Sequence, residues 1–72
     1  MNELVYILEA AKEHYVLENM WWESFQESND NTDYVMFSNE RGCVKGLLQA
    51  YEIISGRRVF GFTIDEELEA IA

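Results

Sequence analysis

Apolar residues recur at helical spacing through the first part of the chain. Residues 2–28 contain neither proline nor glycine, and at about 100° per residue their large apolar side chains fall mostly in one stripe. The stripe comprises Leu4, Ile7, Leu8, Ala11, Tyr15, Trp22 and Phe25, with Leu17 and Trp21 at its edge. The opposite side carries Glu9, Glu13, Glu23 and Glu27. This pattern predicts one long amphipathic helix over residues 2–28, with a buried face and an acidic, solvated face.

A second helix is predicted over residues 39–55. The polar residues 28–33 that precede it compete for backbone hydrogen bonds, so we expect a loop there. Ser38 and Asn39 are suitable N-caps, and Gly56 is a suitable C-cap. Between them one face is apolar and comprises Val44, Leu47, Leu48, Tyr51 and Ile54.

A short helix is predicted over residues 64–71, where Thr63 and Glu66 have the spacing of a capping box. We therefore predict an all-α fold, a single domain over residues 1–72 with three helices. The alternative is an α+β fold, in which residues 34–37 and 58–62 pair as a minor two-stranded ribbon. Without that ribbon, we expect the aromatic side chains of Phe60 and Phe62 to fill the helix interface.

Composition limits how so short a chain can be stabilised. Its 72 residues include one cysteine and one histidine, too few for an intrachain disulfide or a structural zinc site. We expect no metal and no cofactor. Stability must then come from aromatic packing, a second copy or a partner. The chain shows no basic leader and no apolar run long enough for a membrane span, so we expect a cytoplasmic protein with no membrane partner.

The net charge of -9 is distributed unevenly. Residues 1–40 carry nine carboxylates and one lysine, whereas residues 41–62 carry four basic side chains and one glutamate. A phosphate-binding surface needs an excess of lysine and arginine, so direct nucleic-acid binding is not expected. An acidic surface suits a basic protein partner, including one that itself handles nucleic acid.

Two sets of residues carry side chains that could take part in catalysis. His14 and Glu18 lie one turn apart near the apolar stripe, and we interpret them either as a structural pair or with Glu18 exposed, because the helices leave a gap or the helix bends near Asn19. Arg57 or Arg58 could be a further partner for Glu18. The alternative is an acid–base pair or half of a metal site. Cys43, in the first turn of the predicted second helix, has only His14 as a base, and we interpret it as a packed thiol. We predict no enzyme activity and no catalytic residues.

A row of small residues lies along one flank of the predicted second helix. Gly42, Gly46 and Ala50 recur every four residues, which would let another helix approach closely. We expect the long N-terminal helix to pack against this row. The alternative is that the row packs against a second copy of the chain and forms the seam of a homodimer.

Two surfaces on the long helix are candidates for binding a partner. Trp21 and Trp22 point about 100° apart, so one small core cannot bury both equally. With Met20 and Tyr6 also off the main stripe, either a second apolar surface is exposed or other segments cover it. The predicted partner-binding residues are Glu9, Glu13, Glu23, Glu27, Asp30, Asp33 and Trp21.

Two segments carry a resemblance. Residues 47–56 read Leu-Leu-Gln-Ala-Tyr-Glu-Ile-Ile-Ser-Gly and residues 61–68 read Gly-Phe-Thr-Ile-Asp-Glu-Glu-Leu. In these segments, its size and its charge, the chain resembles small orphan proteins of phages and other mobile elements, which include acidic anti-defence inhibitors of the anti-CRISPR kind. The resemblance implies a non-enzymatic inhibitor, a DNA mimic that blocks the nucleic-acid-binding site of a basic host protein such as a Cas nuclease. The alternative is a self-associating structural or adaptor module.

Overall fold

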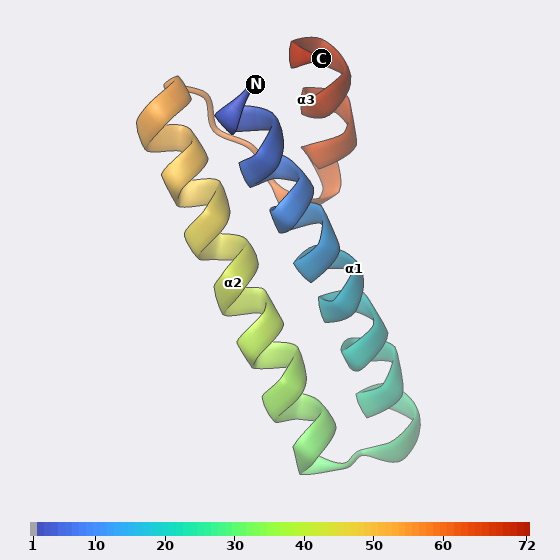
Figure 1. The fold of residues 1–72 in the computed structure, drawn as a ribbon. Helices are drawn as coiled ribbons and strands as arrows, with labels where there is room; N and C mark the ends of the chain where they lie inside the picture. The colour runs from blue at the N-terminus through green and yellow to red at the C-terminus, as the bar shows by residue number, and fades with distance from the viewer. Residues whose placement is uncertain (1) are drawn as a thin grey trace.

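The fold is a long helical hairpin with a short third helix packed against one end. A computed structural model describes residues 2–72, in which α1 (Glu3–Ser28) and α2 (Asn31–Ser55) run antiparallel (Figure 1). A 3-10 turn, η1 (Gly61–Thr63), leads into α3 (Ile64–Ile71), which lies beside the N-terminal half of α1. The molecule measures 40 × 19 × 19 Å, so α3 covers only part of the hairpin's length. The predicted all-α, three-helix fold is confirmed.

The second helix begins earlier than predicted. It starts at Asn31 because Asp30 caps it, accepting a hydrogen bond from the Thr32 amide at 2.8 Å. Asn29 ends α1 in the left-handed conformation, so two residues suffice to reverse the chain. The polar residues 28–33 therefore mark a tight turn with its two caps, and the predicted longer loop is wrong.

Residues 34–37 lie within α2, and the described residues contain no strand, so the two-stranded ribbon is wrong. The earlier start also moves Cys43 from a first turn to the middle of a long helix, where the thiol is exposed. The prediction of a packed thiol is therefore wrong, because Cys43 lies on a part of α2 that the other helices leave uncovered.

The core lies where all three helices meet. Its buried side chains are Leu8, Ala11, Val44, Leu48, Tyr51, Val59 and Ile64. These positions were largely predicted by the two helical stripes. Ile54 was also predicted to face the core, but it is 59% exposed, because a hairpin joined by a single short helix leaves the margins of α2 uncovered.

Aromatic rings take over the packing near the α1–α2 turn, where no third helix is present. The centroids of Trp22 and Phe37 lie 4.8 Å apart, and those of Phe25 and Tyr34 lie 5.3 Å apart. Phe37 is buried, whereas Trp22 remains 42% exposed although it belongs to the predicted stripe. Two helices cannot enclose four rings on all sides, so this cluster is open to solvent on one flank.

A buried polar network joins α3 to the hairpin. Glu67 accepts a hydrogen bond from the Tyr51 hydroxyl at 2.5 Å and two from Arg57, at 2.5 and 2.9 Å. Arg57 lowers the pKa of Glu67, and the Tyr51 hydroxyl adds to the effect. A charged carboxylate with three donors satisfies the requirement for burying such a group.

The connector before α3 differs from prediction in two respects. The Thr63 hydroxyl bonds the backbone of Phe60, closing the η1 turn, so the predicted capping box with Glu66 does not form. Phe60 and Phe62 stack on each other at the surface and do not fill the helix interface. Gly61 between them lies against the Tyr15 ring, which explains why the connector needs a residue without a side chain there.

Candidate protein-binding site

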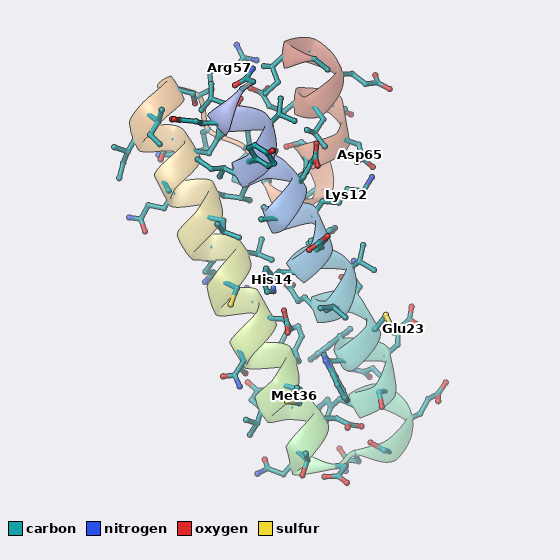
Figure 2. The ribbon with its side chains drawn as sticks, in the orientation of Figure 1. Lys12, His14, Glu23, Met36, Arg57 and Asp65 are labelled. Carbon is teal, nitrogen blue, oxygen red and sulfur yellow. The ribbon has the colours of Figure 1, made fainter. Side chains whose placement is uncertain are left out.

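The acidic side of α1 has no intramolecular partner among the residues that the structure describes. The carboxylates of Glu9, Glu13, Glu23 and Glu27 are all exposed. Within residues 2–72 none of these four side chains has a hydrogen bond or an ion pair. Glu23 projects from the side of α1 away from α2 (Figure 2). Over this stretch α1 rises about 27 Å, at 1.5 Å per residue.

Two apolar side chains lie between the carboxylate pairs. Val16 is 48% exposed and Met20 is 58% exposed. They share the face of the four glutamates because successive members of the set are three or four residues apart. We define the outer face of α1 as Glu9, Glu13, Val16, Met20, Glu23 and Glu27. It is a row with an apolar centre and acidic ends.

The sequence identified most of this row but missed its centre. Met20 was noted as lying off the buried stripe, whereas Val16 was not singled out. The signal was present in the alternating steps of four and three residues from Glu9 to Glu27, which form one continuous ridge on a helix.

The remaining predicted binding residues have structural surroundings of their own. Asp30 caps α2, and Asp33 accepts hydrogen bonds from Ser24 and Ser28, each at 2.7 Å. The Ser24 and Ser28 hydroxyls lower the pKa of Asp33. Trp21 is half-buried and does not belong to the outer face. The structure therefore gives Asp30 and Asp33 a local function in shaping the turn, whether or not they also contact a partner.

The predicted pairing of His14 with Glu18 is wrong. His14 Nδ1 lies 2.5 Å from Glu40 Oε2, so the ring bridges α1 and α2 (Figure 2). Glu18 is rotated about 40° from His14 around the helix axis, which carries it to the other flank of the contact with α2. There burial raises the pKa of Glu18, while the charges of Arg41 and Lys45 oppose the rise.

The two arginines considered as partners for Glu18 are engaged elsewhere. Arg57 bonds Glu67, and Arg58 bonds Glu52 at 2.8 Å. In the part of the chain that the structure describes, no three histidine, cysteine, aspartate or glutamate side chains converge as metal ligands would. Over the same residues, none of the helices combines the length and apolarity that crossing a membrane requires.

Comparisons with known proteins give no match. No family model matches the chain, and searches of curated proteins and of solved structures find none that is significantly similar. The function is therefore argued from the residues and their arrangement alone.

Proposed function

We propose that this protein is a non-enzymatic, protein-binding inhibitor that engages its target through the outer face of α1. The target in this proposal is a basic, nucleic-acid-handling protein such as a Cas nuclease, and the carboxylates occupy the place of nucleic-acid phosphates. The observation that carries the proposal is the exposed row of four unpaired carboxylates around Val16 and Met20.

The arrangement has a cost to the free protein that binding to cations would offset. Glu9–Glu13 and Glu23–Glu27 are like-charge pairs at i,i+4, which destabilise a helix by a few tenths of a kcal/mol each. No basic side chain of the described residues forms an ion pair with these glutamates, and Lys12, next to Glu13 in the sequence, pairs with Asp65 on α3 at 2.6 Å (Figure 2). A lysine- or arginine-rich partner would supply the missing counter-charges.

The apolar centre supplies what charge alone does not. Exposed carboxylates mainly steer association and set its salt dependence, whereas the free energy of binding comes largely from desolvated apolar anchors. In this proposal Val16 and Met20 are such anchors, and the glutamates form a polar rim at either end. The net charge of -9 adds long-range attraction to a basic target.

The proposal is tested by nuclease inhibition. Purified DNA-binding defence nucleases, RNA-guided ones included, would be assayed for cleavage with increasing amounts of this protein. The test variant carries Glu13→Gln, Glu23→Gln and Glu27→Gln. The matched control carries Glu3→Gln, Glu66→Gln and Glu69→Gln, which removes the same charge from exposed carboxylates outside the outer face.

We expect inhibition to weaken at least about tenfold in the outer-face variant, equivalent to about 1.4 kcal/mol of binding free energy. The control should inhibit like the wild type, and rising salt should weaken inhibition by each of these two proteins. Equal inhibition by the two variants would show that the outer face is not the binding site.

A second candidate function, self-association as an adaptor, is favoured by the exposed flank of α2. Apart from chain neighbours and the backbone of α2 itself, no described atom lies within 4 Å of the position that a Cβ would take at Gly42 or Gly46, so the predicted packing of these glycines against α1 is wrong. Ile53 nearby is 78% exposed. Sedimentation over a wide concentration range tests this candidate, and a monomer at every concentration would eliminate it.

A further inference from the structure

The hairpin has a groove that continues from α3 toward the α1–α2 turn. One hollow of about 550 Å³ lies below the connector that leads into α3. A second of about 430 Å³ lies farther along and shares Glu18 and Arg41 with the first. The two hollows adjoin at these residues, and we refer to them together as the trough between α1 and α2. Its lining on α2 extends from Tyr34 to Glu52, about 27 Å of helix at 1.5 Å per residue.

The floor of the trough is apolar and its ends are aromatic. Tyr15, Val44, Leu48 and Val59 line the first hollow and also belong to the core or pack against it. At the α3 end, Phe60 and Phe62 stack with centroids 5.7 Å apart and remain 52% and 76% exposed. At the other end the lining includes the rings of Trp22 and Phe37. Exposed aromatic rings around an apolar floor are typical of a docking groove.

The rim of the trough is basic on a protein that is otherwise acidic. Its lining contains three basic side chains and two carboxylates, whereas the whole chain carries a net charge of -9. Arg58 is paired with Glu52. Arg41 and Lys45 have no ion pair within 4 Å among residues 2–72, and the Arg41 guanidinium lies over the Phe37 ring, 5.9 Å from its centroid.

A helix already packs on the hairpin next to the first hollow, since Phe60, Gly61 and Phe62 in the lining of that hollow lead directly into α3. Helix α3 is acidic and amphipathic: Ile64 is 2% exposed in the core, while Asp65 and Glu66 face solvent. Its carboxylates meet basic side chains beside it, since Glu67 bonds Arg57 and Asp65 bonds Lys12. The trough repeats these conditions next to α3, with an apolar floor and two basic side chains, Arg41 and Lys45, that have no ion pair within 4 Å in the described part of the chain.

We propose that this trough is a second docking site, which takes an acidic amphipathic helix from a partner protein. The apolar side of that helix packs on Val44 and Leu48 between the two aromatic ends. Its carboxylates meet Arg41 and Lys45, as the carboxylates of α3 meet Arg57 and Lys12. This site is separate from the outer face of α1 and selects the opposite charge, so it neither requires the proposed inhibition nor fails with it.

The probe is a fluorescent, capped peptide of about 18 residues, about 27 Å long as a helix, with leucines at three- and four-residue spacing and glutamates beside them. A second peptide has glutamine in place of each glutamate. The protein variant carries Arg41→Gln and Lys45→Gln. The control carries Lys12→Gln and Gln26→Glu, which lowers the net charge equally outside the groove. Circular dichroism confirms that each variant is folded, and fluorescence anisotropy measures binding.

We expect saturable binding of the acidic peptide that weakens at least about tenfold in the Arg41→Gln, Lys45→Gln variant, as loss of about 1.4 kcal/mol implies. The control should bind like the wild type, and the glutamine peptide should bind more weakly. The Phe62→Ala variant, altered at an exposed ring, should also bind more weakly. Absence of saturable binding, equal loss in the control and test variants, or a groove filled by a second copy of this chain in solution would each overturn the proposal.

Discussion

Replacing Gly61 with alanine should destabilise the protein, whereas the same change at Gly46 should stabilise it. A Cβ on Gly61 would overlap Tyr15 Cε1 and would lie 2.6 Å from Cδ1. The ring or the connector must then move by about 1 Å to restore ordinary contact distances. Tyr15 packs against the core and cannot move freely. At Gly46 the Cβ would meet nothing within 4 Å.

The magnitudes follow from general experience with such changes. Overpacking of a well-packed site costs about 1–3 kcal/mol, and the total stability of a chain of this length is roughly 4–11 kcal/mol. We therefore expect the Tm of Gly61→Ala to fall by about 5–20 °C, taking about 4–8 °C per kcal/mol. Gly46→Ala should gain up to about 1 kcal/mol of helix propensity and raise the Tm by several degrees.

Thermal and urea unfolding followed by far-ultraviolet circular dichroism measure both effects. A further comparison in the Tyr15→Val background isolates the cause, because the alanine at Gly61 should cost much less once the ring is gone. A Gly61→Ala protein as stable as the wild type would refute the close packing of the connector on α1. A destabilised Gly46→Ala protein would refute the exposure of that flank and favour self-association through it.

Three further predictions concern ionisable groups of the fold. Tyr51→Phe removes one donor from Glu67 while Arg57 still binds it, so urea unfolding should show a loss of about 1–2 kcal/mol. The pKa of Glu67 is lower in the folded than in the unfolded chain. The ionised carboxylate therefore contributes fully to the free energy of unfolding above the ordinary carboxyl pKa, and this contribution is lost as pH falls through the folded value. Glu67→Gln should remove this part of the acid sensitivity, which urea midpoints measured across that pH range would show. Burial raises the pKa of Glu18, so its negative charge opposes folding at neutral pH. Glu18→Gln should therefore raise the urea midpoint at neutral pH. The gain in stability should disappear in acid, where the carboxyl of the wild type is protonated.

The sequence was sufficient to predict the helices but not all of their ends. The periodic apolar stripe predicts α1 with nearly correct bounds, because a helix of that length needs a continuous buried face. The bounds of α3 were also predicted, although the capping box used to place its start does not form. The start of α2 depends on which polar residue acts as the cap. Residues 28–33 offer several candidates, and the choice of Asp30 follows from the turn that Asn29 makes in the left-handed conformation.

Contacts between helices were the least predictable part. His14 and Glu18 were paired in the sequence because they lie one turn apart, but the line of contact with α2 passes between them. Which residue faces which flank depends on where the partner helix lies, and that is not encoded in the spacing of one helix. The same reason explains why the predicted packing of Gly42 and Gly46 against α1 was wrong. Their small size suggested a close helix contact, but their flank of α2 is uncovered.

Capture from a bacterial lysate that contains a nuclease defence system tests the central claim most directly, with three baits at low and high salt. The baits are the wild type, the outer-face variant with glutamine at Glu13, Glu23 and Glu27, and the control with glutamine at Glu3, Glu66 and Glu69. We predict that the wild type and the control retain a nucleic-acid-binding protein at low salt and release it at high salt, while the outer-face variant does not retain it. Retention of the same protein by the outer-face variant, or recovery of this chain alone at every salt concentration, would contradict the account.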